Sequence, residues 1–311
     1  MSKIPVILDC DPGVDDTLAL LLSHQLQELD VKAITTVAGN APIAYTFRNA
    51  RNVMDYIGAN VPVYKGADKP LLRSLRTAAH IHGEDGMGGV VLPESKRPEE
   101  TEAAWEAIHR IAMEEMGELT LIAVGPLTNI ALALSKYDDM QKLIKRIVMM
   151  GGAADGGNVT PNAEFNIYVD PEAAEMVFAS GIPVYMCGLD VTMRAYMSRA
   201  EIEELMALGS KEAKLFHDVE QKALAIYDIQ GRPGVALHDP AALLFAAYPE
   251  LFQGKWCGVR VETKDKSTCG QTVTDLFCDK KFEEQNAFIV TDVDRDAFVK
   301  KVFDLMGKYE R

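Results

Sequence analysis

Short apolar runs alternate with amphipathic stretches over roughly the first 190 residues. Apolar, often β-branched runs that stop at glycines or carboxylates predict six strands, at 4–9, 31–39, 61–66, 118–125, 145–152 and 182–190. The intervening segments predict helices at 15–26, 44–58, 101–117, 126–135 and 170–181. Because strands that alternate with helices are joined by crossovers, this series predicts an α/β fold with a mostly parallel central sheet and flanking helices.

The rhythm changes after Val191. Helical spacing covers 199–229 and 239–247, two β-rich stretches follow at 256–263 and 270–277, and a last helix ends the chain. These segments predict a C-terminal helical and β-hairpin elaboration of the same core. No repeat or Ser/Pro-rich linker interrupts the chain, so we expect a single domain over residues 1–311.

Composition narrows the classes of partner. The chain has 311 residues, 48% of them hydrophobic, which is enough for one large core. Its formal net charge of -14 disfavours nucleic acid and membrane surfaces as partners and favours small neutral or cationic substrates. No run of about 18 apolar residues predicts a membrane span.

The cysteines and the N-terminus suggest a location. The five cysteines are scattered and show no CxxC pair, which is typical of free thiols in a reducing compartment. The first residues resemble neither a signal peptide nor a targeting helix. We therefore expect a cytoplasmic protein.

The loop DCDPGVDD holds the most informative cluster of polar residues. It places Asp9, Asp11, Asp15 and Asp16 within eight residues at a strand-to-helix junction, where parallel strands open a ligand crevice. Like charges so close together are costly without a cation, and calcium or magnesium would supply one while Gly13 permits a tight turn. The alternative is that the acids only cap the next helix, which needs one or two carboxylates rather than four.

Two other acidic motifs share part of this pattern. An EF-hand begins with Asp-x-Asp, but counting from Asp9 puts Leu20 where its bidentate Glu belongs. An Asp-x-Asp phosphatase also follows a parallel strand and uses its first Asp as nucleophile. It expects a small hydroxyl residue two places after the second Asp, where this chain has Gly13.

A second candidate lies at the start of a predicted helix, where His238 precedes Asp239. In the simplest interpretation Asp239 is an ordinary helix cap beside a surface histidine. Together with the acidic loop, Asp239 instead completes a cation site. Because histidine titrates nearest to physiological pH, His238 is then a candidate general acid.

Three polar residues, Asn158, Glu164 and Asn166, precede another predicted helix. Amides and a carboxylate suit sugar hydroxyls, although each is also an ordinary loop residue. Asn40 ends the second predicted strand, and the backbone carbonyl of Val124 precedes a Gly-Pro turn where it could ligate a hard cation.

The long connection 66–100 contains His80 and His82. Their i, i+2 spacing places both on one face of an extended segment. A metal pair is one interpretation, and neutral histidines beside a ligand base are the other.

The motifs DCDPGVDD, TTVAGN, HIHGEDGMG, GPLTN, MGG, AEFN, DPEAA, GLDVT and HDP follow one another along the chain. In this order the chain resembles the nucleoside hydrolases, the inosine-uridine preferring N-ribohydrolases, over essentially its whole length. The resemblance implies a Rossmann-like domain, hydrolysis of the N-glycosidic bond of ribonucleosides, one calcium ion per subunit, and a homotetramer or homodimer.

The resemblance also implies a role for each candidate. Calcium would be held by Asp11, Asp16, the Val124 carbonyl and Asp239. Asp11 would also accept the proton of the attacking water, and Asp9 would orient the loop from behind. The remaining residues would hold substrate: Asp15 and Asn40 the vicinal ribose hydroxyls, Asn158, Glu164 and Asn166 the 5′-hydroxyl, His82 and Tyr227 the base, with His238 as its acid.

The base itself is less well specified. The segment before His238 offers Tyr227 but otherwise Gln230, Arg232 and Gly/Pro residues, and the two tryptophans fall in predicted core elements. This favours pyrimidine or mixed pyrimidine and purine ribonucleosides, with uridine, cytidine and inosine as candidates. Two rival functions are an Asp-x-Asp phosphatase and a non-catalytic nucleoside-binding protein, and the presence of both His238 and Asp239 argues against the second.

Overall fold

Eight strands form one sheet in the computed structural model, which describes residues 3–279 and 281–309. Their order across the sheet is β3-β2-β1-β4-β5-β6-β12-β9. The strands are β1 (Ile4–Cys10), β2 (Leu29–Thr36), β3 (Val63–Lys65), β4 (Leu119–Ala123), β5 (Ile144–Met150), β6 (Val184–Cys187), β9 (Phe252–Cys257) and β12 (Ala287–Val293). Every neighbouring pair is parallel except β12 with β9. The six predicted strands and the mostly parallel sheet are confirmed.

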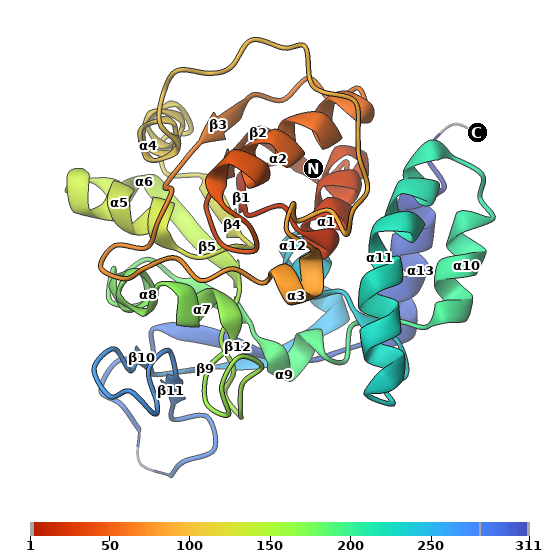
Figure 1. Cartoon of the computed structure of the whole chain (residues 1–311). Coiled ribbons are helices and arrows are strands. Elements are labelled where there is room, and N and C mark those ends of the chain that lie inside the picture. The colour runs from red at the N-terminus through yellow and green to blue at the C-terminus, as the bar shows by residue number, and fades with distance from the viewer. Residues whose placement is uncertain (1–2, 280, 310–311) are drawn as a thin grey trace.

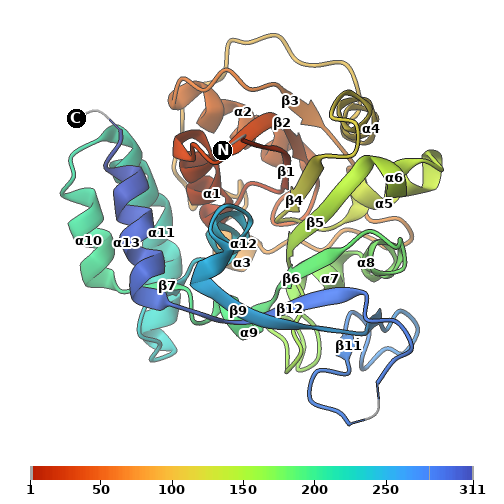
Figure 2. The ribbon, with the colours of Figure 1, turned by 180° about the vertical axis from the view of Figure 1, so that it is seen from behind.

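Helices cover both faces of this sheet. The longer ones are α1 (Val14–Gln25), α2 (Ile43–Tyr56), α4 (Ala104–Glu114), α5 (Thr128–Lys136), α8 (Pro171–Phe178), α10 (Arg199–Met206), α11 (Lys211–Ile229), α12 (His238–Ala247) and α13 (Arg295–Met306). Short turns of helix are α3 (Ala79–His82), α6 (Met140–Leu143), α7 (Phe165–Val169), α9 (Leu189–Thr192) and the 3-10 turn Pro249–Leu251. In Figures 1 and 2, α1, α12 and α13 lie on one side of the sheet and α4, α5 and α8 on the other.

The burial of β1 explains why the sheet is sandwiched. Val6, Ile7 and Leu8 have no exposed surface, although alternate side chains of a strand point to opposite faces. Val6 and Leu8 pack into the core with α1, α2 and α12, whereas Ile7 packs into the core with α4, α5 and α8. The continuous apolar run therefore belongs to a strand covered on both sides.

The C-terminal third extends this core as predicted. Helices α11 and α13 pack against α1, and α10 packs against α11. Strand β10 (Val259–Val261) pairs with β11 (Thr272–Thr274) in an antiparallel hairpin. The predicted β-rich stretch 256–263 is divided at Gly258 between the main sheet and this hairpin. A further two-stranded pair joins β7 (Tyr196–Met197) to β8 (Val235–Ala236).

The strand order places the ligand crevice. The order β3-β2-β1-β4-β5-β6 is that of doubly wound folds, and the chain reverses direction across the sheet between β1 and β4. Ligands bind outside the carboxyl ends of the strands at this switch point. The acidic loop after β1 and Val124 after β4 meet there. Within residues 3–279 and 281–309, no helix is long and apolar enough to cross a bilayer.

Candidate active site

The acidic loop turns directly into α1. Helix α1 begins at Val14 with Gly13 at its cap position, and the Asp16 carboxylate accepts hydrogen bonds from the Gly13 amide (2.8 Å) and the Asp11 amide (3.0 Å). Asp16 therefore closes the loop on itself. The helix-cap interpretation accounts for this one acid and leaves the others unexplained.

The Asp11 carboxylate is closely surrounded by backbone atoms. Its Oδ2 accepts a hydrogen bond from the Asn40 amide at 2.6 Å, whereas its buried Oδ1 has no partner among the described residues. A Cβ atom at Gly39 would lie 2.1 Å from Oδ2, and one at Gly125 would lie 2.6 Å from Oδ1. The two glycines thus let the backbone close around the carboxylate.

Asp239 lies beside the carboxylates of the acidic loop, although it is far from them in the sequence. Helix α12 begins at His238 with Leu237 at its cap and no side-chain cap bond, so the simpler interpretation of Asp239 as the cap of this helix is wrong. Asp239 is buried, and carboxylate oxygens of Asp15, Asp16 and Asp239 lie within 4.8 Å of one another. The position of Asp239 is therefore explained by its long-range contact with the acidic loop and not by a capping role at the start of α12.

Electrostatics in the cluster favour a cation. Burial, together with the neighbouring carboxylates, raises the pKa of Asp11 and of Asp239 well above the ordinary range. The same causes raise the pKa of Asp16 to about 7. Among the described residues, no Lys or Arg forms an ion pair with the cluster. Hard carboxylate oxygens, of which Asp11 Oδ1 and Asp15 Oδ1 have no partner among the described residues, fit calcium or magnesium.

Asp9 lies below the loop and faces away from the cavity. Its Oδ2 accepts hydrogen bonds from the Thr35 hydroxyl (2.6 Å) and the Asn129 amide (2.7 Å), and burial raises its pKa to about 7. A phosphatase would need this first Asp as an accessible nucleophile. Asp9 is held by Thr35 and Asn129 and is not among the described residues that line the cavity, which removes the structural basis of that interpretation.

The residues expected around ribose also hold the site together. The Asn40 side chain donates to Asp16 Oδ2 (3.1 Å), and Asn166 donates to the Val124 carbonyl (2.9 Å). Glu164 caps α7 by accepting from the Ile167 amide (3.2 Å), and it also accepts from the Gly152 amide (2.9 Å). Burial raises the pKa of Glu164 to about 7. Asn158 is exposed and accepts from the Phe165 amide at 2.9 Å.

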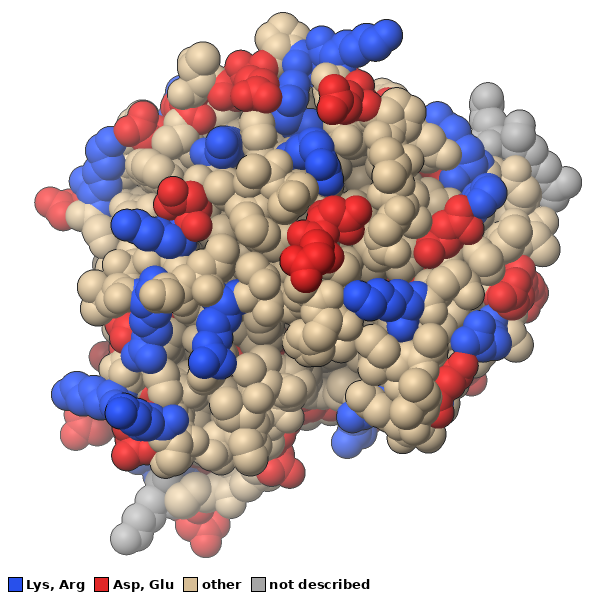
Figure 3. All heavy atoms as spheres, viewed as in Figure 1, with Lys and Arg blue, Asp and Glu red and all other residues tan. Residues whose placement is uncertain are grey.

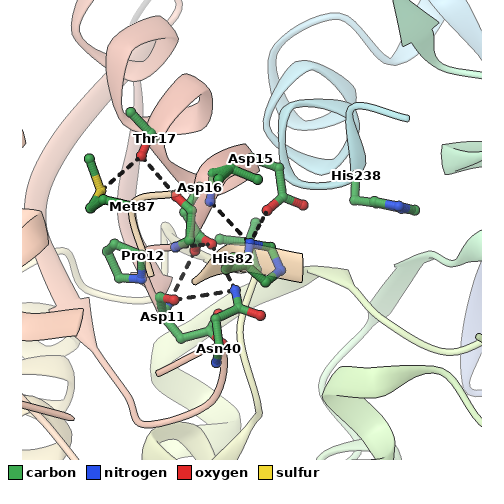
Figure 4. Close-up of polar contacts among 12 residues, drawn as sticks. Asp11, Pro12, Asp15, Asp16, Thr17, Asn40, His82, Met87 and His238 are labelled. Carbon is green, nitrogen blue, oxygen red and sulfur yellow. Dashed lines mark hydrogen bonds and ion pairs between the residues drawn. The ribbon is translucent and has the colours of Figure 1, made fainter. Parts of the chain in front are cut away.

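The histidine pair does not lie in an extended segment, contrary to the prediction. His80 and His82 are in α3, where residues two apart point in different directions. His80 is exposed, whereas the His82 Nδ1 atom accepts a hydrogen bond from the Val14 amide (3.1 Å) and lies 3.9 Å from Asp15 Oδ1. Figure 4 shows His82 beside Asp15 and Asn40. Burial lowers the pKa of His82 to about 3, so it is neutral.

His238 approaches from α12 and lies apart from the His82 group in Figure 4. Its Nδ1 lies 2.8 Å from the Thr192 hydroxyl, and its Nε2 lies 3.4 Å from the Tyr227 hydroxyl. Burial lowers the pKa of His238, an effect partly opposed by Asp15. Thr192 was not singled out from the sequence, although it lies within the motif GLDVT.

One cavity of about 1100 Å³ joins these groups, which is ample for a small-molecule ligand. Of the predicted site residues, it is lined by Asp15, Asn40, His82, Val124, Asn158, Glu164, Asn166, Tyr227, His238 and Asp239. Asp11 and Asp16 are fully buried beside it. Figure 3 shows Lys and Arg interspersed with Asp and Glu on this face, which is hollowed below its centre.

Sequence reasoning missed other lining residues. Phe165 and Ile226 supply apolar surface, and Glu220 is a fully buried carboxylate in the wall. Phe165 could have been found, because it stands between two predicted ligands. Nothing in the local sequence distinguishes Glu220 from the other polar residues of α11.

A doubly wound sheet with buried carboxylates at its switch point and a histidine across the cavity is typical of an α/β enzyme whose acidic site can hold a cation. The model of the family described as inosine-uridine preferring nucleoside hydrolase matches residues 6–300. The chain belongs to this family.

Several relatives match over nearly the whole length. The chain is 42% identical to the pyrimidine-specific ribonucleoside hydrolase RihA of Photobacterium profundum, covering 99% of this chain and all of the relative. It is also 42% identical to the non-specific ribonucleoside hydrolase RihC of Klebsiella pneumoniae, covering 95% and 96%. Among solved structures, the purine-preferring ribonucleoside hydrolase from Gardnerella vaginalis superposes with a TM-score of 0.91 at 33% identity, covering 97% and 98%.

Proposed function

We propose that this ribonucleoside hydrolase is calcium-dependent and acts on pyrimidine nucleosides or on pyrimidine and inosine nucleosides together. Relatives at 42% identity carry the names pyrimidine-specific and non-specific, whereas the purine-preferring structure is 33% identical. Neither Trp105 nor Trp256 is among the described residues that line the cavity, so no tryptophan is in place to stack on a purine.

The observation that carries the proposal is that a carboxylate cluster and a histidine face the same cavity. On one side, Asp15, Asp16 and Asp239 bring carboxylate oxygens within 4.8 Å of one another. On the other, His238 lies between a threonine and a tyrosine hydroxyl. A hydrolase that cleaves a glycosidic bond needs both an activated water and an acid for the leaving group.

Calcium would be held by Asp11, Asp16, the Val124 carbonyl and Asp239. When bound, the cation offsets the repulsion within the cluster and increases the acidity of a water molecule at the site. The Val124 carbonyl already accepts from Asn166, and a carbonyl oxygen retains a second lone pair for a ligand.

Asp11 would act as the general base. Its unpartnered Oδ1 is available for the proton of the water that attacks the anomeric carbon, while the Asn40 amide fixes Oδ2. As the bond to the base breaks, positive charge develops on the ribose ring. The surrounding carboxylates would stabilise that charge.

Ribose would be held at two ends. Asp15, whose buried Oδ1 has no hydrogen-bond partner among the described residues, and Asn40 would bind the vicinal hydroxyls. Asn158, Glu164 and Asn166 would bind the 5′-hydroxyl from the loop before α7 and from α7 itself.

The departing base would receive its proton from His238. The lowered pKa of His238 makes its protonated form a stronger acid than an ordinary imidazolium, and the Tyr227 hydroxyl at 3.4 Å from Nε2 extends the polar path towards the base. His82, neutral and fixed by the Val14 amide, would face the base from α3.

The proposal is tested by a panel of nucleosides. Purified protein would be assayed for base release from uridine, cytidine, inosine and adenosine, with calcium and after removal of metal by a chelator. We expect calcium-dependent release that is fastest for uridine or cytidine. Preference for adenosine, or full activity after metal has been removed and shown to be absent, would contradict the proposed specificity or cofactor.

Two further features follow from the resemblance. We propose a homodimer or homotetramer, which sedimentation velocity measures directly. We also propose a cytoplasmic location, in keeping with five unpaired thiols, four of them buried. Fractionation of the source cells would test it.

A further inference from the structure

Glu220 is a buried carboxylate that the proposed chemistry leaves without a task. It lies on α11 and has no exposed surface, yet it is one of the residues that line the cavity. Neither of its carboxylate oxygens has a hydrogen-bond partner among the described residues. Buried polar groups are nearly always satisfied, and an exception inside a ligand cavity points to a partner that arrives with the ligand.

The position of Glu220 on α11 places it on the base side of the site. The helix lines the cavity with Glu220, Ala223, Ile226, Tyr227 and Gln230, whose spacing of three and four residues defines one helix face. Tyr227 on this face contacts His238. The same helix is tied to α3, which carries His82, because the Lys222 ammonium donates to the Ala79 carbonyl at 3.0 Å.

We propose that the Glu220 carboxyl group binds the edge of the nucleobase through two hydrogen bonds, and thereby acts as a base-recognition residue. The proposal rests on the proposed function, since it names a further contact of the same site.

The chemistry of the carboxyl group fits this task. Burial, with Asp15 nearby, raises the pKa of Glu220 well above its ordinary range, which favours the neutral carboxyl group. A neutral carboxyl offers one O–H donor beside one carbonyl acceptor. Uracil presents an N–H beside a C=O, and cytosine presents a ring nitrogen acceptor beside an amino group. By rotating its carboxyl, one residue can pair with either pyrimidine.

Two substitutions separate recognition from structure. Glu220→Leu keeps the approximate shape and removes both hydrogen-bonding groups, and such an exchange of a buried unpartnered polar group is tolerated by the fold. Glu220→Gln keeps one donor and one acceptor. Glu212→Gln is the matched control, because Glu212 is a buried carboxylate on the same helix that does not line the cavity.

The measurement compares two substrates. Uridine carries the base edge, whereas 4-nitrophenyl β-ribofuranoside carries the same sugar with a leaving group that lacks it. We expect Glu220→Leu to lower kcat/KM for uridine by about 10- to 100-fold, while hydrolysis of the nitrophenyl riboside stays within about threefold. Glu220→Gln should retain more uridine activity than Glu220→Leu, and Glu212→Gln should match the unsubstituted protein.

Equal losses on both substrates, or no loss on either, would overturn the proposal. Calorimetric binding of free uracil gives a second readout that does not require turnover, and Glu220→Leu should weaken it by a similar factor. Unchanged uracil affinity would also overturn the proposal. Absence of ribose release by the unsubstituted protein would instead refute the proposed function, and the uracil titration would still decide the role of Glu220.

Discussion

Asp11 has one oxygen fixed by a backbone amide and the other without a partner, at the point where three loops meet. Replacing it with alanine should abolish calcium binding and lower ribose release from uridine by at least about 10³-fold, because both a ligand and the general base are lost. Steady-state kinetics and calcium titration measure the two effects. Asp155→Asn, at an exposed cavity residue on the loop after β5, should behave like the unsubstituted protein.

Loss of His238 should slow hydrolysis most for substrates whose leaving group must be protonated. We expect His238→Ala to reduce kcat for uridine by about 10²- to 10⁴-fold and to affect inosine by a different factor, because the two bases differ in how readily they leave. A 4-nitrophenyl leaving group needs no proton, so its release should change little. A uniform loss on all three substrates would show that His238 does not act as the acid.

Residue types predicted much of this site, and spatial context decided the rest. Four carboxylates in eight residues indicated a cation because their repulsion is a local property of the sequence. Asp239 was predicted as a cation ligand only in combination with the acidic loop, because its local sequence is equally compatible with a helix cap, and the contact with Asp16 across more than 220 residues separates the two interpretations. Glu220 escaped notice because a carboxylate on an amphipathic helix is ordinary until its burial is known.

At the scale of elements, α7 links stability to the ribose end of the site. Glu164 caps this helix through the Ile167 amide and also holds the Gly152 amide after β5. Glu164→Ala should lower the free energy of unfolding by about 1 kcal/mol, because two amides lose their acceptor. Denaturant unfolding measures the loss. Glu164→Gln retains an acceptor oxygen and should recover most of the stability, and equal losses in the two variants would contradict the capping role.

The elements that sequence predicted best are those with a strong local period. The six parallel strands and the flanking helices follow from apolar runs and helical spacing. β12 was missed, although its residues complete the sheet between β6 and β9, because loops and the hairpin separate it from the regular alternation. The four-residue helix α3 was missed because its His-x-His spacing is equally compatible with an extended segment.

At the scale of the whole molecule, stability should depend jointly on pH and calcium. Burial raises the pKa of Asp16 to about 7 in the folded chain, so the metal-free folded state binds more protons than the unfolded state between about pH 4 and 7. This contribution stabilises the fold at low pH and is lost as pH rises through 7. Calcium binds the ionised carboxylates, so bound calcium stabilises the fold more at high pH than at low pH.

The increase in Tm produced by calcium should therefore be larger at pH 8 than at pH 5.5. Differential scanning calorimetry at both pH values, with saturating calcium and with a chelator, measures it. Asp11→Ala provides the control, because its calcium response should vanish at both pH values. A calcium effect that is the same at pH 5.5 and pH 8 would contradict ligation by the buried carboxylates.

The central claim is that the acidic loop and His238 together cleave the bond between ribose and a pyrimidine base. Its most direct test is to incubate the purified protein with uridine and calcium and to quantify uracil and free ribose in the same samples. We predict that the two products appear in equal amounts. No ribose from uridine, or uracil without an equivalent of free ribose, would contradict the account.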